Sequence, residues 1–152
     1  MKIAQAKAGD LDTVSRIVQD TIGAVYPRYY PAGAVRFFRE HHSREKIAGD
    51  IEAGAVYLIG DEGAPAGTVT VSGDEICRLF VLPQRQGNGY GRALLDFAEG
   101  LVARRYASAR LDTSLPAKAI YLKRGYRETE YCVLETPGGD FLCHDVMAKA
   151  LK

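Results

Sequence analysis

The stretch of this sequence best suited to chemistry runs from Leu79 to Arg92, where an apolar segment leads into a glycine-rich loop. Glycines at 87, 89 and 91 let the backbone approach a ligand closely and turn successive N–H groups towards it. The apolar spacing that follows predicts a helix, whose first N–H groups and dipole favour an anion. Arg85 and Arg92 add positive charge on either side. The combination predicts a cradle for a phosphate or a pyrophosphate.

Two well-known phosphate loops differ from this pattern. A P-loop reads G-x-x-x-x-G-K-[ST], and the fifth position after Gly87 holds Arg92 instead of glycine. The dinucleotide fingerprint G-x-G-x-x-G fits Gly87 and Gly89, but Arg92 stands where its third glycine belongs. Because Asp112 lies near the spacing of a ribose contact, a dinucleotide-binding oxidoreductase stays open as an alternative.

The third interpretation is Gln86-x-x-Gly89-x-Gly91, which resembles the pyrophosphate loop [QR]-x-x-G-x-[GA] of the Gcn5-related N-acetyltransferases, the GNAT superfamily. In that family a helix after the next strand ends in a pattern like N-x-x-A-x-x-F-Y-x-x-x-G-[FY]. This chain reads Ser114-Leu-Pro-Ala117-Lys-Ala-Ile120-Tyr121-Leu-Lys-Arg-Gly125-Tyr126, with serine in place of the usual asparagine and isoleucine in place of the phenylalanine. The two motifs stand in the family's order, and the matching elements run from residue 2 to about 149.

The resemblance implies acetyl-CoA as co-substrate and names the residues that bind it. The pyrophosphate would lie over the loop and the start of the following helix, at Gln86, Gly87, Asn88, Gly89, Tyr90, Gly91 and Arg92. The pantetheine arm would pair like an additional strand with the backbone of Leu79, Phe80 and Val81. Ser114 stands where the family's asparagine contacts pantetheine, so we expect a weakened contact there.

The resemblance also names catalytic residues for direct transfer of acetyl to a primary amine in a ternary complex. Tyr121 matches the family tyrosine that can protonate the leaving thiolate, with packing of its ring in the core as the alternative. Glu75 opens the strand before the loop, where the family sometimes supplies a glutamate base. A period of two puts Glu75 on the same strand face as Cys77, Leu79 and Val81, and a solvated residue at a turn is its alternative.

Tyrosines and histidines precede these motifs. In the family, the segment that holds Tyr26, Tyr29 and Tyr30 lines the acceptor pocket, where they can bind an aromatic or cationic substrate or else pack beneath the second helix. His41 and His42 offer a base near pKa ~6.5, or they are surface or capping histidines. We see no third ligand beside them and expect no metal site.

The elements that must position these residues follow from periodicity and turn residues. We expect a strand at 2–7, helices at 10–26, around 35–38 and at 43–51, with Asp10 and Ser43 as caps, and three strands at 56–59, 68–71 and 75–82. A helix at 92–106, a strand at 109–113, a short helix at 116–123 and a hairpin of strands 131–135 and 141–147 follow. This order predicts a mixed α/β or α+β domain, and the resemblance implies a splayed, mostly antiparallel sheet of about seven strands flanked by about four helices.

Composition limits the classes of protein that fit. The 152 residues have the length of one domain, 1–152, with 47% hydrophobic and 26% charged residues as in a globular protein. Lys and Arg total 20 against 19 Asp and Glu, so no net field favours nucleic acid or a membrane as partner. No apolar run suits a membrane helix or a signal peptide, and the three cysteines lack CxxC spacing. We therefore expect a cytoplasmic protein with free thiols.

The function predicted is that of an acyl-CoA-dependent N-acyltransferase that moves acetyl from acetyl-CoA to a primary amine of a small molecule or a peptide. Cys77 lacks a recognisable paired histidine, so we expect direct transfer without an acyl-enzyme. A non-catalytic module that binds or senses acyl-CoA is the first alternative, and the dinucleotide-binding oxidoreductase is the second. Proteins of this family often dimerise through their terminal strands, so a homodimer is a further expectation.

Overall fold

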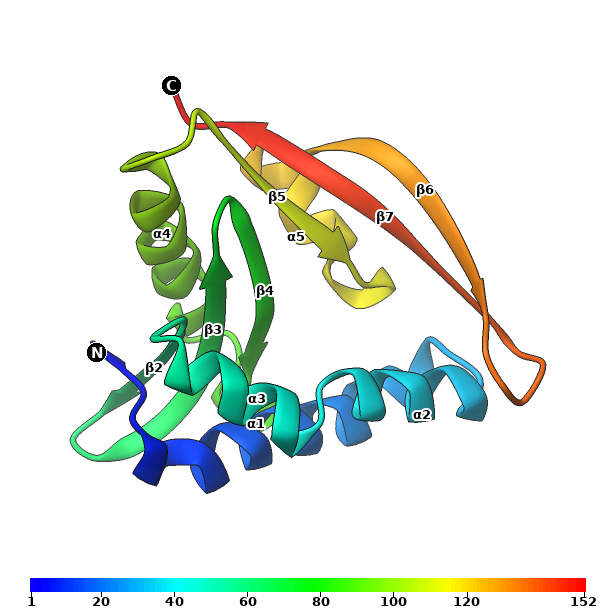
Figure 1. Ribbon diagram of the computed structural model, residues 1–152, viewed down its shortest axis with the longest axis horizontal. Coiled ribbons are helices and arrows are strands. Elements are labelled where there is room, and N and C mark those ends of the chain that lie inside the picture. The colour runs from blue at the N-terminus through cyan, green and yellow to red at the C-terminus, as the bar shows by residue number, and fades with distance from the viewer.

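The computed structural model describes residues 1–152 and is built on a single seven-stranded sheet with the strand order β1-β2-β3-β4-β5-β7-β6 (Figure 1). Every neighbouring pair is antiparallel except β4 and β5. The predicted mixed, mostly antiparallel sheet is confirmed. The strands are β1 (Lys2–Gln5), β2 (Val56–Asp61), β3 (Ala64–Ser72), β4 (Glu75–Val81), β5 (Ser108–Thr113), β6 (Arg127–Glu135) and β7 (Phe141–Ala150).

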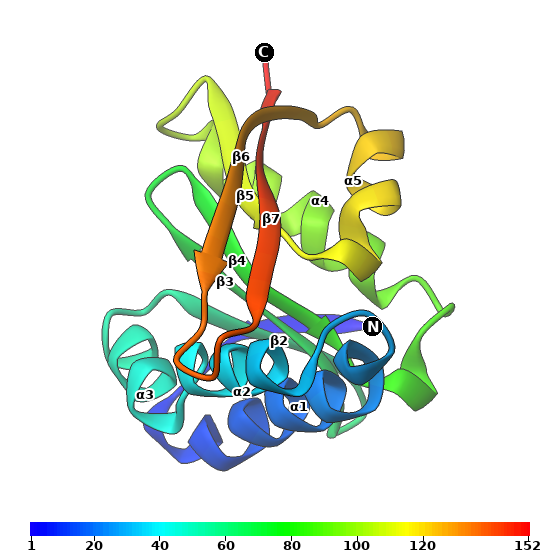
Figure 2. The ribbon, with the colours of Figure 1, turned by 90° about the vertical axis from the view of Figure 1, so that its right-hand side faces the viewer.

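Five α-helices, one more than the family pattern suggested, cover the two faces of the sheet (Figure 2). One apolar cluster lies between the sheet and the helices α4 and α5, and a second lies between the sheet and the helices α1, α2 and α3. None of the helices is long and apolar enough to cross a membrane. The helices are α1 (Leu11–Val25), α2 (Ala32–His41), α3 (Arg44–Glu52), α4 (Tyr90–Ala103) and α5 (Lys118–Arg124).

Helix boundaries follow local signals with two differences. Ser43 accepts a hydrogen bond from the N–H of Lys46 and caps α3 as expected. Asp10 does not cap α1, because its carboxylate accepts from the backbone N–H of Lys7 and closes the preceding 3-10 turn instead. Helix α4 begins at Tyr90, two residues earlier than expected, because Gly89 takes the left-handed conformation (φ +88°) and turns the chain into the helix there.

Strand β4 contains a bulge that overturns one expectation. Thr70 faces Cys77 and Thr68 faces Phe80, so two residues of β4 lie against one of β3, and Arg78 has a φ of +46°. The alternation of faces is therefore inverted after Cys77. Glu75 and Cys77 lie on one face and Leu79 and Val81 on the other, so the predicted shared face of these four residues is wrong.

The sheet splays between β4 and β5, as the resemblance implied. These strands share a single residue pair, Glu75 with Arg110, whereas β5 and β7 are paired over six positions. Beyond that pair β4 and β5 diverge in Figure 1. The edge of β4 that faces β5 is consequently not paired with a strand from Cys77 to Val81. Apart from the carbonyl of Val81, which accepts from the side chain of Gln86, the N–H and C=O groups on this edge are free to bind an extended ligand.

Candidate functional site

A cavity of about 610 Å³ opens where the sheet splays, between the end of β4, the glycine loop, α4 and α5. Each residue that the resemblance assigned to the cofactor lines this cavity except Asn88. Tyr121 and Tyr26 line it as well. Tertiary structure thus brings the two motifs, which are about thirty residues apart in sequence, to the walls of one cavity.

The loop presents a row of unpaired backbone donors to this cavity. The N–H groups of residues 87 to 92 have no backbone acceptor, and the next N–H, that of Ala93, donates to the carbonyl of Gly89. Gly87 (φ +79°) and Gly89 (φ +88°) both occupy the left-handed region, in which a side chain is strained. Successive donors at a helix N-terminus form an anion-binding site, as the sequence predicted.

The side chains of the loop stabilise its conformation and do not occupy the space over its N–H groups. The Gln86 amide donates to the carbonyl of Val81 at 3.0 Å, and the Asn88 amide donates to the carbonyl of Arg85 at 3.1 Å. Arg85 donates to the Tyr90 hydroxyl at 2.6 Å, and that hydroxyl donates to Asp61. Because these side chains turn back on the loop, its N–H groups are left for a ligand.

Positive charge surrounds the cradle unevenly. Arg85 lies 3.6 Å from the carboxylate of Asp61, which offsets its charge. Arg92 and Lys123 line the cavity and have no ion-pair partner within the chain. The sequence analysis missed Lys123, although its place on the helix that carries Tyr121, two residues further on, was a usable signal.

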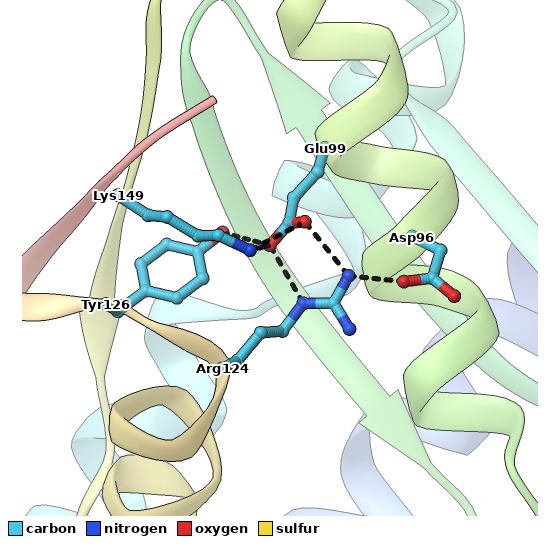
Figure 3. A network of polar contacts seen from close by, with 5 residues as sticks. All are labelled: Asp96, Glu99, Arg124, Tyr126 and Lys149. Atoms are coloured by element: carbon cyan, nitrogen blue, oxygen red, sulfur yellow. Dashed lines mark hydrogen bonds and ion pairs between the residues drawn. The ribbon is translucent and has the colours of Figure 1, made fainter. Parts of the chain in front are cut away.

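An ion-pair network fixes the spacing between the two helices that flank the cavity (Figure 3). Glu99 of α4 binds Arg124, at the end of α5, at 2.8 Å, and also accepts from Tyr126 at 3.0 Å and Lys149 at 3.2 Å. Asp96 adds a second carboxylate on Arg124, at 2.5 Å. Burial by itself would raise the pKa of Glu99, but these hydrogen bonds outweigh it and hold the pKa below its usual value. The network therefore holds α4 and α5, the two helices that flank the cavity, at a fixed separation.

Tyr121 is suited to donate a proton. It is buried, its ring packs edge-on against Tyr126 with 5.6 Å between centroids, and its hydroxyl makes no hydrogen bond within the chain. Burial raises the pKa of Tyr121, so the phenol keeps its proton at neutral pH. The ring packs in the core as the alternative had it, and the same residue lines the cavity.

The three tyrosines expected at an acceptor pocket have different environments. Tyr26 lines the cavity, its hydroxyl is within hydrogen-bonding reach of Ser114, and burial raises its pKa to about 12. Tyr30 is buried under α2 and accepts a hydrogen bond from the N–H of Leu115 at 2.7 Å. Tyr29 is half exposed and does not line the cavity. Tyr26 and Tyr30 tie the segment between α1 and α2 to the end of β5.

Glu75 lies away from the cavity. Its carboxylate pairs with Arg110 at 3.1 Å at the closed end of the splay. Four residues of strand, or about 13 Å, separate it from Leu79, where the cavity begins. The nearby Cys77 is a protonated thiol at neutral pH, because burial raises its pKa to about 11.

His42 is held as a neutral donor. Its Nδ1 accepts from Nε of Arg78 at 3.1 Å, and Arg78 is paired with Asp50. Burial, followed by the charges of His41, Arg78 and Lys46, lowers the pKa of His42 to about 3. The remaining proton must therefore be on Nε2, and this ring has no free lone pair with which to act as a base.

Residues 25–136 match the family model described as acetyltransferase (GNAT) domain. The chain belongs to the GNAT acetyltransferase family. No curated protein matches the sequence.

Solved structures of GNAT proteins share the fold. A Rhodopseudomonas palustris protein named "GCN5-related N-acetyltransferase: aminotransferase, class-II" has a TM-score of 0.88 at 22% identity, over 98% of this chain and 94% of that one. PaiA N-acetyltransferase from Thermoplasma acidophilum, in complex with coenzyme A, has a TM-score of 0.74 at 21% identity over 98% of both chains. The protein yncA from Salmonella typhimurium, with its cofactor acetyl-CoA, has a TM-score of 0.74 at 19% identity, over 100% of this chain and 94% of that one.

Proposed function

We propose that this GNAT protein transfers the acetyl group of acetyl-CoA to a primary amine. The observation that carries the proposal is the run of unpaired N–H donors at 87–92 beside the unpaired edge of β4, within one cavity. A donor row suits a pyrophosphate, and a free strand edge suits the amide groups of pantetheine. Two structures of similar fold contain coenzyme A or acetyl-CoA.

Each part of the substrate has a matching part of the chain. Residues 87–92 would hold the pyrophosphate with Arg92 and Lys123 as counter-ions, and the backbone of Leu79, Phe80 and Val81 would hold the pantetheine arm. Ser114 is already within reach of Tyr26, so we expect this pair, rather than a lone asparagine, to contact pantetheine.

Acetyl transfer from the thioester to a protonated amine requires a proton donor for the thiolate and a proton acceptor for the amine. Tyr121 donates to the departing thiolate, for which its buried, protonated hydroxyl in the cavity is suited. An alkyl amine with a pKa of ~10.4 is neutral in only about one molecule in 2,500 at pH 7, so a basic acceptor needs a proton acceptor as well. The proposal gives that role to neither Glu75, which is paired with Arg110, nor His42.

Calorimetric titration with acetyl-CoA, with NADH and ATP as controls, tests the proposal together with an assay of thiol release on a panel of primary amines. Selective binding of acetyl-CoA with turnover of an amine supports it. Binding without turnover of any amine favours the acyl-CoA-sensing module. Binding of NADH without acetyl-CoA would restore the dinucleotide alternative. As part of this proposal, the protein acts in the cytoplasm, where acetyl-CoA is present.

A further inference from the structure

All three histidines of the chain converge on the side of the splay opposite the cofactor cavity. His41 and His42 end α2 with their rings 4.9 Å apart, and His144 belongs to β7, about a hundred residues later. The charges that act on His41 are those of Lys46 and Arg78, followed by those of Asp112 and His144, so Asp112 and the three histidines share one region with these two cations. Arg78 is paired with Asp50. None of them lines the 610 Å³ cavity. We call this region the histidine face.

Strand register explains how His144 comes to this face. Asp112 lies opposite Val146 in the pairing of β5 with β7, so Asp112, Val146 and His144 project from the same side of the sheet. Leu111 and Met147, which are the chain neighbours of Asp112 and Val146 and pair with each other, project to the other side of the sheet. Both pack in the cluster under α4 and α5. Asp112 and His144 are therefore diagonal neighbours on adjacent strands.

The same alternation places His144 next to an apolar cluster that borders the cavity. Leu142, two residues before His144, projects from the same side and packs in the cluster that contains Tyr26 and Phe80. Both of those aromatic residues line the cofactor cavity. Two residues of strand span about 6.6 Å, so the imidazole lies beside the wall that separates the histidine face from the cavity.

One ring nitrogen of His144 has no partner. Its Nδ1 is buried and makes no hydrogen bond, whereas Nε2 is not among the buried unpaired atoms. Buried polar atoms in native proteins are nearly always paired, so an unpaired ring nitrogen needs an explanation, and a role in proton transfer is one. A neutral imidazole can accept a proton on one ring nitrogen and then release the proton of its other ring nitrogen to solvent, which is what a proton shuttle requires.

The neighbouring groups are less suited to accept a proton. Nδ1 of His42 is occupied by Arg78, and Cys77 is a buried thiol. His41 is exposed and stacked in parallel on Phe37 with 5.6 Å between centroids. Asp112 is exposed and forms no ion pair, so its charge is available to a cation on this face.

We propose that the acceptor amine enters from the histidine face, that Asp112 binds it as an alkylammonium ion, and that His144 takes its proton. This inference rests on the proposed acetyl transfer. The ammonium gives a proton to His144, the neutral amine forms a C–N bond with the acetyl carbonyl carbon, and the C–S bond breaks. Tyr121 protonates the thiolate and recovers a proton when the nitrogen of the new C–N bond loses its second proton to give the neutral amide. The imidazolium returns its proton to water. The acceptor class is a strongly basic alkyl amine rather than an arylamine.

Acetylation of amines of graded basicity tests the assignment. With acetyl-CoA, the wild type and His144→Gln are assayed on primary amines whose pKa runs from about 5 to about 10. His144→Gln should lower kcat/KM about 100-fold for the most basic amines and less than about 3-fold for amines already neutral at pH 7. Asp112→Asn should raise KM about 10-fold for the cationic amines and leave kcat nearly unchanged.

His41→Gln is the matched control, since it makes the same chemical change on the opposite wall. It should change kcat/KM by less than about 3-fold for every amine, and the same basicity-dependent loss in this variant would move the base to His41 and overturn the proposal. Equal loss for all amines in His144→Gln would make His144 structural and also overturn it.

Titration with acetyl-CoA separates this inference from the proposed function. Variants that bind it as the wild type does are folded, so their kinetic losses report on the histidine face. If the wild type binds acetyl-CoA and acetylates weakly basic amines alone, no base operates and the assignment to His144 fails by itself. If the wild type does not bind acetyl-CoA, or turns over no amine, the proposed function fails and this inference fails with it.

Discussion

The two sides of the splayed sheet build their sites from different atoms. In the cofactor cavity the unpaired groups are backbone N–H donors at 87–92, and the side chains of Gln86 and Asn88 serve only to hold the loop. On the histidine face the unpaired groups are side chains, the Nδ1 of His144 and the carboxylate of Asp112. A backbone site tolerates exchange of most side chains but not of its glycines, whereas a side-chain site depends on the identity of each residue.

Each side is also braced by its own charged network. Glu99 and Arg124 join α4 to α5 behind the cavity. On the other side, Arg78 at the bulge of β4 joins Asp50 of α3 to His42 at the end of α2. The first network consists of groups that are charged at neutral pH, while the second includes a histidine kept neutral. The two sides should therefore respond to acid over different pH ranges.

The largest expected effect is that of Gly89→Val on cofactor binding. Valine at a φ of +88° is strained and would move the backbone away from the conformation that aligns the N–H donors, so the affinity for acetyl-CoA should fall about 1,000-fold or more by calorimetry. Gly63→Val is the matched control, because Gly63 also has a left-handed φ (+78°), a Cβ there meets no atom within 4 Å, and the residue does not line the cavity. An unchanged affinity in folded Gly89→Val would remove the pyrophosphate from this loop.

Next in size is the effect of Tyr121→Phe on turnover. Loss of the buried hydroxyl removes the proton donor, so kcat should fall about 100-fold while the affinity for acetyl-CoA stays within about 3-fold. Tyr131→Phe, at an exposed position on β6, makes the same chemical change and should have no effect. Full activity of Tyr121→Phe would leave the residue a packing role alone.

Acid should act first on the side that carries the histidines. The pKa of His42 is about 3 in the folded chain against an ordinary 6.5, and that of His41 is also lowered. The unfolded chain therefore binds these protons first, so stability is fully present above pH 6.5 and is lost as the pH falls towards 3. The free energy of unfolding should decrease by about 2 kcal/mol between pH 6.5 and 4.5.

Denaturant titrations of two variants sharpen this comparison. His42→Gln should flatten the dependence of stability on pH between 6.5 and 4.5. Glu99→Gln should lower stability by a constant amount between pH 6.5 and 4.5, so the pH dependence there is unchanged. The difference from the wild type should shrink below about pH 4.5, because the wild type loses the contribution of Glu99 there. The opposite assignment of the two ranges would contradict the pairing of His42 with Arg78.

The smallest effect concerns two exposed helical glycines, one on each side. A Cβ at Gly100 of α4 or at Gly49 of α3 meets no atom within 4 Å, so alanine at either position should raise stability by about 1 kcal/mol. Thermal unfolding should move up by about 2–4 °C in each, and acetyl-CoA affinity should not change. A change in affinity for Gly100→Ala alone would show that the interior of α4, beyond its first turn, contributes to binding.

What the sequence determined is the part of the site that is local. Glycines at 87 and 89, a helix directly after the glycine loop and a tyrosine seven residues after Ser114 define the cradle and the proton donor, because backbone conformation depends on neighbours in the chain. The mostly antiparallel sheet of about seven strands and its splay came from a family resemblance on the same motifs, whereas the order of the strands was not predicted. The lengths of the last two strands were underestimated. Strand β6 begins at Arg127 with exposed polar residues, which show no apolar alternation from which a strand could be predicted.

Only the tertiary structure decided the rest. The bulge at Arg78 inverts the faces of β4, which separates Glu75 from Leu79, and no pattern of residue types encodes a single left-handed arginine. His144 meets His41 and Asp112 through the registers of β5, β6 and β7, and a shift of one residue would turn it to the other face. Contacts between residues a hundred positions apart depend on how whole elements pack, and that is a property of the folded chain.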